Sequence, residues 1–279
     1  PIEMSAVIEE AWHATATRWP YGERALFVVT TVSINWILYV GYSVLIFSCY
    51  KFGWGARFKV QPDKWPPEKL AWSSLWSTMF DFWLVQPVAA AYVAYPLLVM
   101  GGMDFGPSLP PIGQSFAKIV AWFVMSDTYF YWAHRACHTW PWIYRNIHKK
   151  HHVFTTPIPI AATYAHPVEA ALVNFPTLVL PVILLPSHFL VFLTYMLLSV
   201  WEVLESHCGY DFPWSLWRYV RGSANFHDFH VRKTVGPWIL HVTQHSHNVG
   251  NYGTLTYTWD KLLGTDKAYR NHLKSLKNQ

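Results

Sequence analysis

The sequence predicts an all-α integral membrane protein, a helical bundle of about four or five spans that carries a histidine-rich helical cap. Two observations predict this fold. Of the 279 residues, 52% are hydrophobic and only 13% are charged, whereas a soluble domain usually carries about a quarter charged residues. The apolar residues are also gathered into long uncharged runs, and many of the histidines into closely spaced groups.

The apolar runs predict the spans in chain order. Residues 25–50 and 82–102 carry no charge, and each is long enough for a bilayer core, which needs about 20 helical residues. Residues 115–133 form a weaker candidate, because Lys118 and Asp127 interrupt the run. The last apolar stretch breaks at Pro-Ser-His and predicts a helical hairpin over 170–205. Span lengths disfavour the alternative, a soluble protein with buried helices.

Basic residues predict the orientation of these spans. The 51–72 loop is rich in lysine and arginine, so the positive-inside rule places it in the cytosol. The 102–114 loop has neither residue and suits the opposite side. Counting spans from there brings every histidine-rich segment to the cytosolic face. The net charge of +5 is explained by these flanking residues, and no nucleic-acid motif accompanies it.

Cysteine usage and the amino-terminal residues give weaker constraints. The three cysteines lie far apart and form no disulfide framework. Residues 1–24 are polar and net acidic, so we expect no signal peptide there. The first span is then expected to serve as the membrane signal.

Three histidine motifs dominate the region after residue 133. His134 and His138 form HxxxH, and His227 and His230 form HxxH. Spacings of three and four place side chains on one helical face. We expect the same of the HxxHH motif, in which His148, His151 and His152 would share one face.

The number and spacing of these histidines favour a pair of metal ions. Imidazole suits zinc, copper, iron and nickel. The sequence has no HExxH zinc-protease motif, and no Glu-x-x-His pairs of a soluble di-iron bundle lie near the spans. A three-histidine zinc site would not need so many ligands. The cap is therefore expected to hold a di-metal site, whereas an isolated HxxxH would be read as ordinary histidines.

Two further residues share the helical face of the first motif. Asp127, Tyr131, His134 and His138 are spaced four, three and four residues apart. A carboxylate inside an apolar span is costly unless it meets a partner or water. We expect Asp127 and Tyr131 to support the ligands, with the carboxylate hydrogen-bonding an imidazole. The alternative is an aspartate that simply meets water at the interface.

The full set of motifs resembles the membrane fatty acid hydroxylase superfamily, and is most similar to the 4-methylsterol monooxygenases, or sterol methyl oxidases. The resemblance covers roughly residues 120–266. It is carried by the segments YWAHRACH (131–138), IHKKHH (147–152), YAHPVE (164–169), SHCGYDFPWSL (206–216), NFHDFH (225–230) and HNVGNY (247–252).

The resemblance implies a ligand set and a reaction. Two iron ions would be bound by His134, His138, His148, His151, His152, His227 and His230, with His166 and His207 as further ligands. The reaction would be O2-dependent oxidation of an unactivated carbon of a membrane lipid, namely the 4-methyl group of a sterol precursor. Electrons would come from NAD(P)H through cytochrome b5 or a reductase.

The resemblance also implies a cellular setting and a division of the chain. The protein would be a multi-pass protein of the endoplasmic reticulum membrane, with a complex of sterol-synthesis enzymes as a further partner. Residues 1–114 would form an amino-terminal membrane region with two spans, and residues 115–279 the catalytic domain.

The third histidine motif departs from the family pattern. The family ends this motif with two adjacent histidines, but here Val231 follows His230. Removing residues 231–244 restores the pattern as NFHDFHHSHNVGNY, so we infer an insertion there. His245 then becomes a ligand adjacent to His230 in space if the insertion loops out. His13, His188 and His272 are expected to be ordinary histidines.

Several alternative functions remain open from sequence. Within the superfamily they are a fatty acyl or sphingoid-base hydroxylase and an alkane-forming wax enzyme. A non-catalytic relative inactivated by the 231–244 insertion is another. A transporter that uses intramembrane His and Asp is disfavoured, because the histidines follow the span ends and the sequence contains no repeat.

Overall fold

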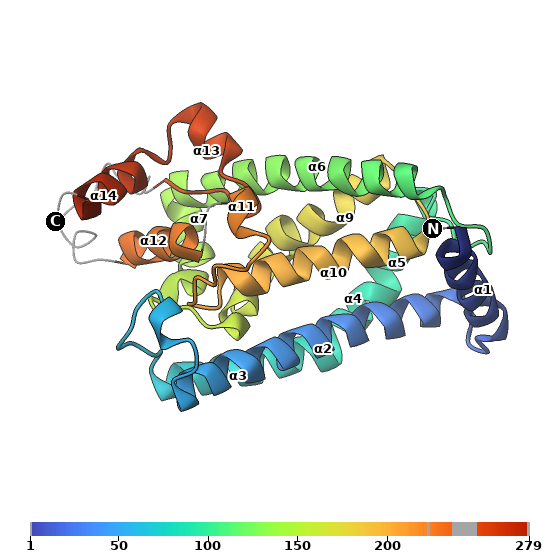
Figure 1. Ribbon diagram of the computed structural model, residues 1–279, viewed down its shortest axis with the longest axis horizontal. Coiled ribbons are helices and arrows are strands. Elements are labelled where there is room, and N and C mark those ends of the chain that lie inside the picture. Colours follow the sequence, from blue (N-terminus) through green and yellow to red (C-terminus); the bar gives the residue numbers. More distant parts are fainter. Residues whose placement is uncertain (1, 222–223, 236–249, 278–279) are drawn as a thin grey trace. The chain divides into compact units, whose positions relative to one another are not determined.

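The computed structural model describes residues 2–221, 224–235 and 250–277, and helices are its only extended regular elements in these ranges (Figure 1). The predicted all-α fold is therefore confirmed. The α-helices are α1 (Ile2–Arg18), α2 (Gly22–Phe52), α3 (Glu68–Phe80), α4 (Gln86–Ala89), α5 (Tyr95–Met100), α6 (Ile112–Thr139), α7 (Pro141–Asn146), α8 (Pro167–Glu169), α9 (Phe175–Leu184), α10 (Phe189–Ser206), α11 (Arg218–Arg221), α12 (Ala224–Val235), α13 (Thr258–Leu263) and α14 (Lys267–Lys277).

Shorter helical turns of other types connect these elements. Three are 3₁₀ helices, η1 (Ala56–Phe58), η4 (His148–Val153) and η5 (Pro159–Thr163). Three are π-helical turns, η2 (Asp81–Val85), η3 (Ala90–Ala94) and η6 (Ala170–Asn174). Two isolated backbone bridges, Lys59 with Tyr210 and Asp104 with His188, complete the regular pairing of the described residues.

Within the described residues, four helical stretches are long and apolar enough to cross a membrane, namely Gly22–Phe52, Glu68–Met100, Pro167–Leu184 and Phe189–Ser206. They coincide with the first two predicted spans and the two arms of the 170–205 hairpin. Helix α6 contains the weaker candidate at 115–133 and is 28 residues long, but it is not among the four.

Each of the three π-helical turns lies just on the amino-terminal side of a proline within a membrane-crossing stretch. Pro87, Pro96 and Pro176 each follow the last residue of such a turn by two positions. Proline lacks an N–H, and its ring clashes with the carbonyl of the residue four positions earlier. That carbonyl belongs to the π-helical turn in all three cases. The wider turn lets the helix continue through proline without breaking the span.

The chain divides into two units, and the first contains residues up to Ile37, Met79–Ser126 and Leu178–Ser199. Its core is aromatic. Phe105 and Phe189 stack with their ring centroids 4.7 Å apart, and Phe189 also packs on Phe27. His188 bonds the carbonyl of Gly106 through Nε2 at 2.9 Å. Within this unit His188 has the structural role that was expected of it.

The second unit contains Leu38–Thr78, Asp127–Thr177 and the residues from Val200 onward. It holds the carboxyl-terminal half of α6 and all the described histidine motifs. Small apolar clusters stabilise it, one of them formed by Ile46, Cys49, Cys208 and Tyr210. Cys49, Cys137 and Cys208 are buried and form no disulfide with one another in this structure. The proposed boundary between residues 114 and 115 stays a prediction.

Candidate metal centre

Histidines from α6, η4, α12 and the turn after α10 meet in two neighbouring groups inside the second unit. The possible ligand nitrogens of each group lie within 4.8 Å of one another. The inner histidine group comprises His134, His138, His148, His152 and His230, and the outer histidine group comprises His151, His207 and His227.

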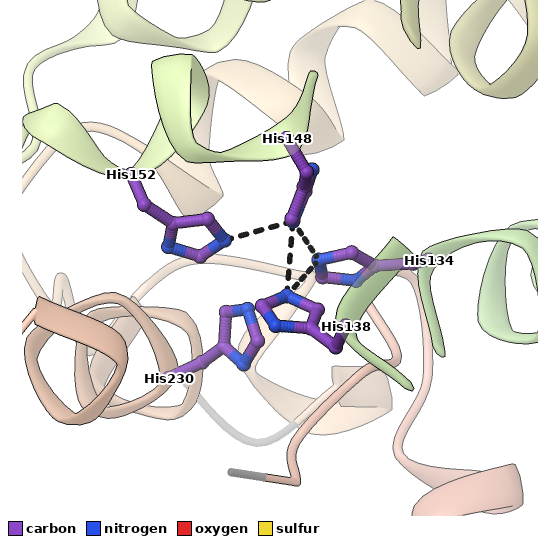
Figure 2. A group of neighbouring side chains, drawn as sticks. All are labelled: His134, His138, His148, His152 and His230. Atoms are coloured by element: carbon purple, nitrogen blue, oxygen red, sulfur yellow. Dashed lines mark hydrogen bonds between the residues drawn. The ribbon is translucent and has the colours of Figure 1, made fainter. Parts of the chain in front are cut away.

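The inner histidine group is built from α6, η4 and α12, and Figure 2 shows its rings pointing toward one another. His134 and His138 lie one turn apart on α6, and their Nε2 atoms are 3.2 Å apart. The short helix α7, which begins at Pro141, turns the chain so that η4 faces the end of α6. His148 Nε2 then lies 3.2 Å from His134 Nε2 and 2.9 Å from His138 Nε2.

The outer histidine group is smaller, and one of its three described members is partly exposed. His207 directly follows α10, and its ring centroid is 4.2 Å from that of His227 on α12. The Nε2 atoms of His207 and His151 are 3.4 Å apart. His151 is only half-buried, whereas every member of the inner histidine group is buried.

Two histidine motifs divide between the two groups instead of serving one group each. His151 and His152 are adjacent in sequence, but their ring planes differ by 81°. His152 therefore reaches the inner histidine group and His151 the outer one, which differs from the single face expected for HxxHH. In the same way His230 of α12 joins the inner group and His227 joins the outer group.

Hydrogen bonds at Nδ1 fix the tautomers of several of these rings. His134 Nδ1 donates to the Tyr252 carbonyl at 2.7 Å, and His230 Nδ1 donates to the Gly250 carbonyl at 2.8 Å. In the outer group His207 Nδ1 donates to the Val203 carbonyl at 2.9 Å. A neutral imidazole has one N–H, so a ring that donates through Nδ1 has a lone pair at Nε2.

A carboxylate fixes the tautomer of His148 in the same way as these backbone carbonyls do. Its Nδ1 lies 2.9 Å from Oε1 of Glu169, and both side chains are buried. His148 Nε2 therefore also presents a lone pair, and it faces the lone pair of His134 Nε2 at 3.2 Å. Two lone pairs at this distance repel each other unless a cation lies between them.

The residues present therefore fit a metal ion. A metal–nitrogen bond to imidazole is about 2.1 Å, so neighbouring ligand nitrogens around one ion are about 3 Å apart. The inner nitrogens match this spacing, including the 2.8 Å between His152 Nε2 and His148 Nε2. Imidazole held by an outer hydrogen bond at its second nitrogen is the usual arrangement for a metal-bound histidine.

Burial also keeps these imidazoles neutral. It lowers the pKa of His148 to about 3. Burial is likewise the main cause that lowers the pKa of His230 to about 3, although the hydrogen bond to Gly250 opposes it. For His152, burial and the neighbouring imidazoles hold the pKa well below 6.5. Neutral imidazole is the form that binds metals.

The other predicted site residues lie elsewhere. His166 caps the start of α8, where its Nδ1 accepts from the Val168 N–H at 3.2 Å, and it belongs to neither group. Asp127 accepts from the backbone N–H of Thr256 at 2.9 Å and from its hydroxyl at 2.5 Å. Tyr131 bonds Thr265 through its hydroxyl at 3.1 Å.

The groups that hydrogen-bond the grouped histidines differ from those expected from the sequence. Among the described residues, the carboxylate beside a grouped imidazole is Glu169 rather than Asp127. Glu169 belongs to the YAHPVE segment, which marked the family resemblance without indicating which residue contacts a histidine. The Gly250 and Tyr252 carbonyls were missed because backbone contacts leave no residue-type signal. His245 lies outside the described residues.

The fold and the site together define a class, an all-helical membrane protein whose histidines converge in two adjacent groups suited to metal ions. A model of the family described as fatty acid hydroxylase matches residues 119–265. The chain belongs to the fatty acid hydroxylase family.

Similar proteins are found in plants and in a slime mould. Methylsterol monooxygenase 2-2 of Arabidopsis thaliana is 30% identical over 98% of this chain and 97% of its own length. A very-long-chain aldehyde decarbonylase of Oryza sativa is 30% identical over 96% of this chain and 95% of its own length. A putative methylsterol monooxygenase of Dictyostelium discoideum is 31% identical over 89% of this chain and 87% of its own length. No solved structure matches the chain.

Proposed function

We propose that this chain is a membrane monooxygenase that uses two histidine-bound iron ions and O2 to oxidise the 4-methyl group of a sterol precursor. The observation that carries the proposal is the convergence of imidazole lone pairs in two adjacent histidine groups. The proposed ligands are the members of those groups, together with His245, which the sequence pattern places beside His230. His166, which caps α8, is kept as a proposed ligand on the family resemblance alone.

The reaction balances as a monooxygenation. One C–H bond of the methyl group becomes C–OH, and the second oxygen atom leaves as water after two electrons and two protons are taken up. When bound, the iron ions supply the activation of O2 that side chains alone do not provide. The electrons come from NAD(P)H through cytochrome b5 or a reductase. Repeated turnover on the same carbon would carry the methyl group to a carboxylate.

The protein's own residues hold the site for this chemistry. Burial of the inner histidine group excludes water and keeps its imidazoles neutral. Glu169 orients His148 and adds a negative charge next to a ligand ring. The outer histidine group has three described members, and a metal held there by few protein ligands would have a coordination position open for O2.

A sterol substrate is favoured by the names of several similar proteins. Relatives from Arabidopsis thaliana and Dictyostelium discoideum are called methylsterol monooxygenases. The four apolar helices would embed the protein in the bilayer, where a lipid substrate is dissolved. We place the protein in the endoplasmic reticulum membrane with its histidine groups toward the cytosol, where the electron donors are. A complex of sterol-synthesis enzymes is the proposed wider partner.

A second candidate comes from the Oryza sativa relative, which is called a very-long-chain aldehyde decarbonylase. This relative and the Arabidopsis thaliana protein are both 30% identical to the chain, over 96% and 98% of its length, so overall similarity favours neither chemistry.

The 231–244 insertion remains a proposal and bears on activity. Residues 231–235 continue helix α12 beyond His230, and residues 236–244 lie outside the described ranges. Deleting the insertion would make His230 and His245 adjacent in sequence.

The deciding experiment expresses the chain with and without residues 231–244 in yeast that lacks its own methylsterol oxidase. Iron content and conversion of a 4,4-dimethylsterol are measured, and a very-long-chain aldehyde is offered in parallel. Oxidised sterol from either form supports the proposal, and conversion only by the shortened form also supports the insertion.

Alkane formation without sterol oxidation would instead select the decarbonylase. Iron-free protein in both forms would contradict the metal centre. His148→Ala provides the inactive control, and the unmodified yeast strain provides the background.

A further inference from the structure

One short loop, residues 250–256, supports ligands that come from two different helices. The Gly250 carbonyl accepts from His230 Nδ1 of α12, and the Tyr252 carbonyl accepts from His134 Nδ1 of α6. We call this segment the carbonyl loop. It fixes the tautomer of both rings and so determines which nitrogen faces the inner histidine group.

The carbonyl loop is held from behind by Asp260, a completely buried residue in the first turn of α13. Its Oδ1 accepts from the Tyr252 N–H at 2.9 Å, and its Oδ2 accepts from the Gly253 N–H at 2.7 Å. Thr265 adds a hydroxyl donor to Oδ1 at 2.6 Å. Tyr252 thus binds Asp260 through its N–H and His134 through its C=O.

Two positions of the carbonyl loop have no space for a side chain. Gly250 has a φ of +76°, and a Cβ added there would collide with the backbone oxygen of Thr265. A Cβ at Gly253 would collide with the Thr256 carbonyl and approach Asp260 Oδ2. Glycine is the residue that tolerates both a positive φ and such close backbone contact. The close packing is what brings the two carbonyls to the histidines.

Further contacts tie the loop to both ligand helices. Asn251 donates from Nδ2 to the Phe226 carbonyl at 3.2 Å, one turn before His230 on α12. At the far end Asp127 of α6 accepts from both the N–H and the hydroxyl of Thr256. Asp260 binds the middle of the loop, between these two attachments.

An acidic residue in the first turn of a helix commonly only stabilises that helix. Asp260 differs, because both of its oxygens accept from groups outside α13 and two of those donors belong to the carbonyl loop. We propose that Asp260 is a positioning residue of the metal centre, which acts through Tyr252 and Gly253 to set His134 and His230. This inference rests on the proposed function, since it requires that the inner histidine group binds a metal.

The test is a titration of the metal-free full-length protein with Co²⁺, whose visible absorption reports ligand geometry. Asp260→Asn keeps the side-chain shape but replaces one acceptor oxygen with a donor NH₂. We expect a 10- to 100-fold loss of Co²⁺ affinity at the inner group and an altered spectrum, about the cost of losing a residue that supports a ligand. Asp260→Glu should recover part of the affinity.

The matched control is Asp266→Asn. Asp266 is also buried and acidic, and it pairs with Arg270 rather than with the carbonyl loop. The thermal unfolding of each metal-free variant is measured beside the titration. If Asp260→Asn does not fold, Gly250→Ala displaces the same loop at the His230 contact without removing a charge, and it should lower Co²⁺ affinity in the same way.

The outcomes separate the two proposals. An unmodified protein that binds no Co²⁺ overturns the proposed metal centre and this inference with it. Normal Co²⁺ binding and an unchanged spectrum in Asp260→Asn or Gly250→Ala overturn the positioning role alone. Reduced affinity with a metal-free unfolding temperature equal to that of Asp266→Asn supports it.

Discussion

The inner and outer histidine groups use the same side chain but place it in different surroundings. The inner group has five members, all buried, and one of its rings is paired with the carboxylate of Glu169. The outer group has three described members, of which His151 is half-buried, and His207 is supported by a neutral backbone carbonyl.

In the proposed di-iron enzyme, this difference would give the two metals different tasks. Five buried ligands and a nearby negative charge favour tight binding of a cation at the inner group. Three ligands at a more accessible position leave open coordination sites and let a metal exchange more readily. The sequence motifs conceal this division, since two of the three motifs contribute histidines to both groups.

The largest expected effect is at His148, whose Nε2 lies within 3.2 Å of three other inner nitrogens. His148→Ala should abolish metal binding at the inner group and reduce turnover by more than the roughly 100-fold that loss of a supporting residue can cause. Iron content and product formation measure it. His13→Ala, which changes an exposed histidine of α1, is the control and should behave as the unmodified protein does. Full activity of His148→Ala would remove the inner group from the site.

The second-largest effect is expected on chelation, which should remove the metals of the two groups at different rates. We expect a mild chelator to remove the outer metal first, leaving one metal per chain in an inactive protein that regains activity when iron is returned. His151→Ala should produce the same one-metal state without a chelator. Metal analysis at successive times provides the measurement, and simultaneous loss of both metals would show that the groups do not differ in accessibility.

A smaller effect is expected at Glu169, whose hydrogen bond is to His148 of the inner group. Glu169→Gln keeps an acceptor for His148 Nδ1 but removes the charge, so inner-site affinity should fall about 10-fold. Affinity at the outer site should fall less, because Glu169 interacts with His151 through charge alone. Glu68→Gln, at an exposed acid of α3, is the control. Equal weakening at both sites in a Co²⁺ titration would contradict the asymmetry.

The smallest effect is expected at Asp127, which meets the carbonyl loop at its far end. Asp127→Ala leaves the N–H and hydroxyl of Thr256 without their acceptor, which costs about 1–3 kcal/mol of folding free energy. Thermal unfolding should show this loss clearly, while inner-site metal affinity falls less than in Asp260→Asn. If Asp127→Ala lost more metal affinity than Asp260→Asn, Asp127 rather than Asp260 would be the main residue that positions the loop.

Sequence alone predicted the elements that depend on composition and short spacing. The spans followed from uncharged runs, and His134 with His138 followed from helical periodicity, because α6 is regular there. The position of Asp127 on the same face was also correct, but its partner was not predictable, since Thr256 lies 129 residues away. The division of His151 from His152 depends on a 3₁₀ turn, which carries no apolar period.

The support of the ligands was the least predictable part. His134 and His230 are fixed by backbone carbonyls, and any residue type offers a carbonyl. Only the unusual backbone of the loop, with its positive φ at Gly250, distinguishes the segment, and glycine in a sequence has many explanations. His166 caps helix α8 and belongs to neither described histidine group, and its assignment as a ligand stays a prediction.

Two motifs, HxxHH and HxxH, contribute to both histidine groups and so connect the groups covalently. His151 and His152 are consecutive, and His227 and His230 share one turn of α12, so two short covalent spacers join the inner and outer groups. A shift of either backbone segment changes both coordination environments together. By linkage, occupancy of one group should therefore raise or lower the affinity of the other by the same factor in each direction.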